Sequence, residues 1–344
     1  MSTSAGKLWG LRRLADASGR FKMVAVDQRP PIKQLVMAAR EMDSATDEDV
    51  RAVKRLLVQE LAAGSSALLL DPHHAYPASI DLVPSTKGLL LTLEDSLFDE
   101  SPGGRRSSEI SDWSVEKIKR SGADAVKLLA WYRPDAAPDV LVHQQTLVAR
   151  VGDACLRFDI PFVFELLTYP MAGDIDDTTR RAEHVIQSVR DFGSVEYGVD
   201  LFKLECPILP VGVPDPDDPV AGPPVQAVFD ELGRAASQPW VMLSAGAGRT
   251  EFRRILTFAY RAGASGFLAG RTIWWGPLQQ FPDMDSAGRE LRTDGADYLR
   301  EIGHLTDENA LPFYEHPSYR DRGAVLAGDL LDFRSTYGDF GGVS

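Results

Sequence analysis

Cysteine, basic residues and long apolar runs are all scarce in this chain of 344 residues. Its two cysteines, Cys155 and Cys206, are too few for a disulfide framework, which indicates a reducing compartment. The 37 lysines and arginines are outnumbered by 50 acidic residues, so the basic surface of a nucleic-acid-binding protein is missing. No apolar run approaches the ~18 residues of a membrane-spanning helix, and the first residues lack a signal-peptide core. We therefore expect a cytoplasmic protein that binds neither nucleic acid nor membrane.

What the chain has instead is a regular alternation of short apolar runs and longer amphipathic segments. Most of the runs begin as nearly continuous apolar segments, as in parallel strands that are covered on both faces. There are eight of them, at 23–29, 66–75, 87–95, 125–132, 161–169, 201–207, 240–246 and 266–274. Eight such alternations in a chain of this length predict a closed (β/α)8 TIM barrel rather than an open doubly wound sheet.

The connections between these runs differ in length. Most have the apolar spacing of a helix. In the segment 111–122, either Ser111 or Ser114 is expected to cap the N-terminus of the helix. The link 77–86, between the second and third runs, looks too short for a full helix.

Longer segments lie outside this pattern. The loops 96–110 and 208–224 exceed the usual length, and they suit substrate contact as well as they suit surface or subunit contact. An extra helix is expected at about 4–19 and a helical extension at about 294–344. We treat the whole chain, 1–344, as one barrel domain.

Chemistry in such a barrel takes place at the carboxyl ends of the strands, where side chains point into the mouth. Polar residues occupy that end of one run after another, namely Asp27, Arg29, Asp71, Glu94, Lys127, Glu165, Lys203, Glu205, Ser244 and Arg271. Because a buried charge is costly unless it is paired or useful, this concentration predicts an active site. Asp71 and Glu94 are more simply read as helix caps or as partners of internal lysines.

The strongest of these signals is a pair of lysines within apolar strands, Lys127 and Lys203. Desolvation disfavours the ammonium form of a buried lysine and is expected to lower its pKa. A neutral amine is the nucleophile that forms a Schiff base with a ketone. The alternative is that both lysines only pair with acids inside the barrel.

Glu165 is placed to serve these lysines. It lies on the strand between theirs, and since adjacent strands are ~4.8 Å apart the two lysine backbones are expected roughly 10 Å apart. Their side chains can therefore converge on one substrate carbon. Glu205 shares a strand face with Lys203 and competes with Glu165 for the acid/base role.

The last two strands end in turns suited to an anion. The segment 243–248, with Ser244 and Gly246, ends one strand, and Gly270 and Arg271 end the next. Backbone amides of such glycine-rich turns, a helix N-terminus and an arginine form the phosphate cradle of many barrels. By contrast, adjacent histidines such as those at 73–74 point to opposite faces of a strand, so we expect no metal site.

Six stretches resemble the class I tagatose 1,6-bisphosphate aldolases and the related sulfofructose-phosphate aldolases. They are AVDQR (25–29), GADAVKLLAWY (122–132), IPFVFELLTY (160–169), YGVDLFKLECP (197–207), LSAG (243–246) and AGRTIWWG (269–276). The resemblance implies metal- and cofactor-free cleavage of a phosphorylated ketose to dihydroxyacetone phosphate and a three-carbon aldehyde. It also implies a role for each matching residue: Lys203 forms the Schiff base, Glu165 moves protons, Lys127, Asp27 and Gln28 hold hydroxyls or position the acid/base, and Ser244 and Arg271 bind the 1-phosphate.

Three departures from the family pattern border the far end of the substrate. They are Pro30–Pro31, the sequence Asp-Pro-His-His at 71–74 and the insertion 104–106. The pattern leaves carbon six open to phosphate, sulfonate or neither, with Arg29, Arg105 and Arg106 as candidate anion contacts. A homo-oligomer is expected by analogy. The competing interpretations are a metal-dependent aldolase or isomerase, and a regulatory barrel that binds sugar phosphate without turnover.

Overall fold

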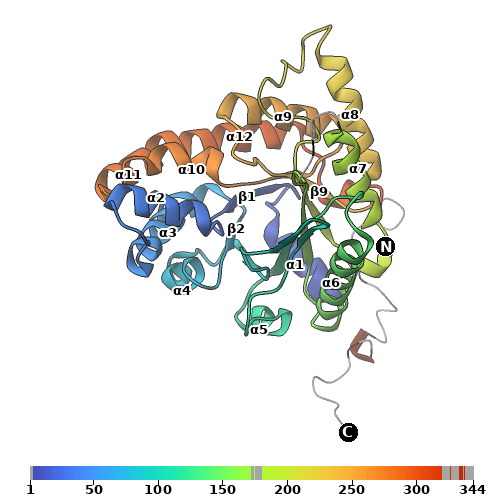
Figure 1. The fold of residues 1–344 in the computed structure, drawn as a ribbon, viewed down its shortest axis with the longest axis horizontal. Helices are drawn as coiled ribbons and strands as arrows, with labels where there is room; N and C mark the ends of the chain where they lie inside the picture. The colour runs from blue at the N-terminus through green and yellow to red at the C-terminus, as the bar shows by residue number, and fades with distance from the viewer. Residues whose placement is uncertain are drawn as a thin grey trace.

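Eight parallel strands close into a barrel in the computed structural model, which describes residues 3–171, 174, 180–319, 326, 333–335 and 337 (Figure 1). The strands are β1 (Phe21–Ala25), β2 (Ala67–Leu70), β3 (Gly88–Thr92), β6 (Ala125–Trp131), β7 (Phe162–Leu167), β8 (Leu201–Leu204), β9 (Trp240–Met242) and β10 (Gly266–Ala269). Their order around the barrel is β1-β10-β9-β8-β7-β6-β3-β2. The predicted (β/α)8 architecture is confirmed.

The alternation of side chains along each strand produces two apolar clusters. One fills the barrel and contains Ala125 of β6, Val163 of β7 and Leu201 of β8, all wholly buried. The other lies between the strands and the surrounding helices. Because strand side chains alternate with a period of two, the residue two positions after each interior one also points inward, and these residues are Lys127, Glu165 and Lys203. The charged groups therefore form a layer above the apolar filling.

Helices surround the strands on the outside (Figure 1). They are α2 (Pro30–Arg40), α3 (Asp47–Leu61), α4 (Ala75–Ser79), α5 (Val115–Arg120), α6 (Pro138–Arg157), α7 (Arg181–Asp191), α8 (Gly222–Ala235), α9 (Arg249–Arg261) and α10 (Arg271–Leu278). Ser114 caps α5 by accepting a hydrogen bond from the amide of Lys117. The short link between β2 and β3 holds only α4 and the 3-10 turn Ile80–Leu82, as its length predicted.

Further helices close the barrel's amino end and its side. The N-terminal helix α1 (Ala5–Leu14) is shorter than the predicted 4–19 and packs where β3 and β6 begin. After α10 follow α11 (Met284–Glu290), the π-helical turn Leu291–Gly295 and α12 (Ala296–Asn309), which packs against α3, α9 and β1. Most of the predicted extension beyond 319 lies outside the described residues. No helix in the described ranges is long and apolar enough to span a membrane.

The long loop after β3 contains a hairpin that the sequence pattern did not reveal. Strands β4 (Asp99–Ser101) and β5 (Gly104–Arg106) pair antiparallel within it. The guanidinium carbon of Arg105 lies 4.4 Å from the ring centroid of Phe98 and 4.9 Å from those of Trp131 and Tyr169. Since Trp131 ends β6 and Tyr169 follows β7, this cation–π cluster holds the hairpin over that side of the mouth.

Gly266, the first residue of β10, lies against β1 where the barrel closes, and its substitution is predicted to affect stability. Its φ is +148°, and an added Cβ would lie 1.9 Å from the carbonyl oxygen of Phe21 in β1. We expect Gly266→Ala to lower the free energy of unfolding by roughly 3 kcal/mol or more, through strain and overlap together. Gly122→Ala is the matched control, because its φ is +89° but nothing lies within 4 Å, so only about 1 kcal/mol is expected. If urea unfolding shows that the two variants lose equal amounts of unfolding free energy, this explanation is contradicted.

Candidate active site

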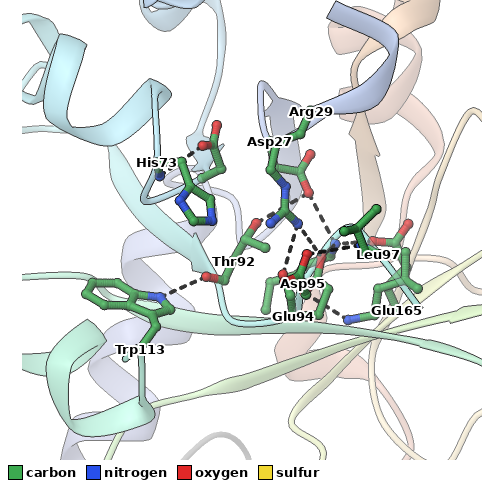
Figure 2. A network of polar contacts seen from close by, with 12 residues as sticks. Asp27, Arg29, His73, Thr92, Glu94, Asp95, Leu97, Trp113 and Glu165 are labelled. Atoms are coloured by element: carbon green, nitrogen blue, oxygen red, sulfur yellow. Dashed lines mark hydrogen bonds and ion pairs between the residues drawn. The ribbon is translucent and has the colours of Figure 1, made fainter. Parts of the chain in front are cut away.

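The mouth of the barrel holds a buried network of charged side chains. Lys203 of β8 lies opposite Glu165 of β7 in the strand register, and its Nζ is 2.9 Å from Glu165 Oε2. The same carboxylate oxygen lies 2.7 Å from Lys127 Nζ. Asp27 Oδ2 and Glu94 Oε1 lie 3.1 and 2.5 Å from Lys127 Nζ. Figure 2 shows the Asp27 and Arg29 side chains pointing toward Glu94 and Glu165. The structure thus brings together the two lysines and the glutamate that the sequence had singled out.

The charge on Lys127 is opposite to the sequence expectation. Burial alone acts to lower the pKa of this lysine, which is 1% exposed, but Glu165, Glu94 and Asp27 surround its ammonium and raise the pKa above the usual value. The expectation of a lowered pKa is therefore wrong for Lys127. Desolvation was the only effect visible from one strand, whereas the counter-charges come from neighbouring strands.

The carboxylates around Lys127 do not share one protonation behaviour. Burial acts to raise the pKa of Glu165, but Lys127 and Lys203 outweigh it and hold this pKa below its usual value. Burial likewise opposes ionisation of Asp27, yet the same lysines lower its pKa to about 2. For Glu94, burial prevails over Lys127 and raises the pKa. Glu165 and Asp27 are therefore carboxylates at neutral pH, and Glu94 is the acid of the cluster most easily protonated.

Glu205 has other partners. Its Oε1 accepts hydrogen bonds from the amide and hydroxyl of Thr168, at 2.5 and 2.9 Å, and its other oxygen pairs with Arg181. Arg181 is the first residue of α7, so Glu205 fixes that helix to the barrel. The structure therefore places Glu165, rather than Glu205, against Lys203.

The segment after β1 carries buried polar atoms without hydrogen-bond partners. They are Oδ1 of Asp27, Oε1 of Gln28, and Nε and Nη1 of Arg29. The remaining terminal nitrogen of Arg29 donates to the carbonyl oxygen of Glu94 at 2.9 Å. Leaving a buried polar group unpaired costs about 1–3 kcal/mol, so this segment is suited to a ligand rich in hydroxyl groups.

The glycine-rich turns for which the sequence predicts an anion cradle lie where β9 and β10 end. Ala245 and Gly246 have φ values of 48° and 81°, which turn the chain after the buried Ser244. The Arg271 guanidinium covers this turn, because a Cβ added at Gly246 would lie 3.4 Å from its Cζ. Arg271 begins α10, and Gly270 precedes it. Gly246 and Arg271 line a cavity of about 480 Å³, large enough for a phosphate group.

The other arginines predicted near the far end already have protein partners. Arg105 pairs with Glu100 at 2.9 Å, and Arg106 pairs with Asp139. Arg29 is 7% exposed and keeps its two unpartnered nitrogens. It is therefore the arginine of the three with buried donors still to satisfy.

Asp71 and Glu94 are partners of internal lysines, as their simpler interpretation held. Glu94 pairs with Lys127, and Asp71 pairs with Lys54, a residue that sequence reasoning missed. Lys54 and Asp71 are both wholly buried. The signal was present in the spacing, since Lys54 lies four residues after the buried Val50 and so on the apolar face of α3.

The adjacent histidines do not share one environment. His74 is buried, and its Nε2 lies 2.9 Å from Asp47 Oδ1, whereas His73 is exposed at the mouth. Across the described ranges, no three or more His, Cys, Asp or Glu side chains gather in a way that could hold a metal ion.

Comparison with known proteins identifies the family of this chain. The model of the DeoC/LacD family of aldolases matches residues 21–276. Tagatose 1,6-diphosphate aldolase 2 of Streptococcus mutans is 32% identical over 319 residues, covering 90% of this chain and 96% of that relative. Tagatose 1,6-diphosphate aldolase of Staphylococcus aureus is 30% identical over 321 residues, covering 90% and 98%.

Solved structures share the fold at lower identity. A Schiff-base-forming fructose-1,6-bisphosphate aldolase is 18% identical with a TM-score of 0.56, covering 87% of this chain and 99% of that one. The fructose-bisphosphate aldolase of Plasmodium falciparum is 14% identical with a TM-score of 0.59, covering 92% and 97%. The family model's match to residues 21–276 and the relatives at 30–32% identity show that the chain belongs to the DeoC/LacD family of aldolases.

Proposed function

We propose that the protein is a class I aldolase that reversibly cleaves a phosphorylated ketose through a Schiff base on Lys203. The observation that carries this proposal is the buried Lys203–Glu165 contact of 2.9 Å, with an amine and a proton acceptor side by side at the mouth. The products are dihydroxyacetone phosphate and a three-carbon aldehyde. Relatives named for tagatose 1,6-diphosphate support this substrate class.

The lysine and the glutamate divide the chemistry. Lys203 gives up a proton to the Glu165 carboxylate, and its amine adds to the ketone carbon of the substrate. Glu165 returns the proton to the carbinolamine hydroxyl, which leaves as water and forms the iminium. Glu165 then accepts the proton of the carbon-four hydroxyl, the C3–C4 bond breaks, and its electron pair moves to the iminium to give an enamine. Protonation at carbon three and hydrolysis release dihydroxyacetone phosphate and free Lys203.

Lys127 remains a cation throughout these reaction steps. Its raised pKa keeps it protonated while the glutamate beside it cycles between acid and base. At 2.7 Å from Glu165 and 3.1 Å from Asp27, its ammonium orients both carboxylates and is close enough to donate to a substrate hydroxyl.

The two ends of the substrate lie at different parts of the mouth. The 1-phosphate occupies the cradle formed by Ser244, Gly246, Gly270 and Arg271, at the ends of β9 and β10. Asp27, Gln28 and Arg29 hold the hydroxyl groups and the far end, which satisfies their unpartnered atoms. The ketose 1-phosphate portion is common to tagatose 1,6-bisphosphate and sulfofructose 1-phosphate, and Arg29 suits an anion in either. We also propose that the enzyme acts in the cytoplasm as a homo-oligomer built from single-domain subunits.

The first test is chemical trapping of the Schiff base. Borohydride with dihydroxyacetone phosphate is expected to add one reduced adduct to the peptide that contains Lys203, as located by mass spectrometry. Lys203→Arg keeps a cation beside Glu165 but forms no imine, so neither adduct nor cleavage is expected. An adduct on Lys127 instead would contradict the assignment.

The second test removes the proton acceptor. Glu165→Gln is expected to lower kcat by about 10²–10⁴ while the protein still folds, because the amide cannot accept the protons that this carboxylate moves. In the wild type, the lowered pKa of Glu165 in the free enzyme means that this group limits kcat/KM only as the pH falls below the usual glutamate range. Glu205→Gln is the matched comparison. If that variant loses kcat and Glu165→Gln does not, the acid/base assignment is wrong.

The third test concerns the phosphate cradle. Charge-assisted hydrogen bonds are worth about 1.5–3 kcal/mol, so Arg271→Ala is expected to raise KM for the phosphorylated ketose roughly 10- to 100-fold. Turnover of the same sugar without its 1-phosphate should change little. Arg253→Ala, on the exposed side of α9, is the control and should leave both values unchanged. Equal effects of the two variants would argue against this cradle.

A further inference from the structure

Lys54 is a buried cation that the proposed chemistry does not use. It projects from α3, on the outside of the barrel, and is wholly buried together with its partner Asp71. Its Nζ also donates to the carbonyl oxygen of Val26 at 3.0 Å. The amine therefore reaches from a surrounding helix to the carboxyl ends of β1 and β2.

Both partners of Lys54 belong to segments that border the mouth. Val26 directly precedes Asp27, the start of the segment with unpartnered buried atoms. Asp71 follows β2, and its Oδ1 accepts hydrogen bonds from the amides of His73 and His74 at 3.0 and 2.9 Å. One ammonium group thus ties the β1 loop to the β2 loop.

Stability alone gives little reason for this pair. Removing two charges from water costs more than their attraction often returns, and apolar replacements of similar size are commonly neutral or stabilising. What the pair supplies is geometry, since an ammonium with fixed acceptors holds both loops in one position. A displacement of about 1 Å in a binding segment is enough to cost roughly 100-fold in rate.

We propose that Lys54 is a positioning residue that holds Asp27, Gln28 and Arg29 in their substrate-binding arrangement through Val26 and Asp71. The proposal rests on the proposed function for the part of the substrate that these residues bind. It makes Lys54 a determinant of affinity for the hydroxylated far portion of the ketose. Lys203, Ser244, Gly246 and Arg271 lie on or after other strands and are not among the hydrogen-bond partners of Lys54.

The test uses the double variant Lys54→Met/Asp71→Asn, which removes both charges and leaves an amide oxygen to accept from the backbone of His73 and His74. We expect a folded protein whose KM for the ketose bisphosphate rises tenfold or more, with a smaller change in kcat. Dihydroxyacetone phosphate lacks the far carbons. The concentration of it that gives half-maximal borohydride trapping should therefore change less than threefold. Arg51→Met, on the exposed face of the same helix, is the control and should match the wild type.

Hydrogen exchange supplies a readout that does not depend on activity. The amides of residues 26–29 are expected to exchange at least tenfold faster in the double variant than in the Arg51→Met control. An unchanged KM with unchanged exchange in a folded double variant would overturn the proposal, and so would equal losses for both ligands. If the wild type forms no Schiff base with any ketose phosphate, the proposed function fails, and exchange at 26–29 then decides alone whether Lys54 anchors this segment.

Discussion

The ammonium of Lys127 among the carboxylates of Asp27, Glu94 and Glu165 is the interaction on which the rest of the site depends. Three carboxyl groups so deeply buried and so close together are tolerable only because the ammonium of Lys127 offsets their charge. The arrangement keeps Glu165 ionised and aimed at Lys203. Without the central cation, neighbouring carboxylates would repel one another and take up protons, and Lys203 would lose its carboxylate partner.

Two lysines with the same apparent sequence context therefore have different surroundings. Lys127 has three carboxylates within ion-pair distance, whereas in the described part of the chain Lys203 has Glu165 alone. Glu165 lies between them and responds to both. The asymmetry comes from Asp27 and Glu94, which follow β1 and β3 and contact Lys127. Under the proposed mechanism, a lysine that loses its proton is thus placed close to one that keeps it.

The fold and the main site residues were predictable from the sequence because their signals are local. Eight apolar runs and a period of two along each strand are sufficient to place Lys127, Glu165 and Lys203 at one end of a barrel. The sign of the Lys127 pKa shift was not predictable, because its counter-charges come from strands distant in the chain. The Lys54–Asp71 pair was missed because a lysine on a helix is ordinarily taken as solvated, and its burial depends on how α3 packs.

The position of Gln28 against the last strand links function to the completion of folding. A Cβ added at Gly270 would lie 2.8 Å from Gln28 Nε2, because β1 pairs with β10. The segment that follows the first strand therefore meets the turn at Gly270 only when the two ends of the sheet have joined. A partly synthesised chain, with Lys127, Glu165 and Lys203 already made, still lacks this junction. A ligand that contacts both segments at once therefore requires the fully closed barrel.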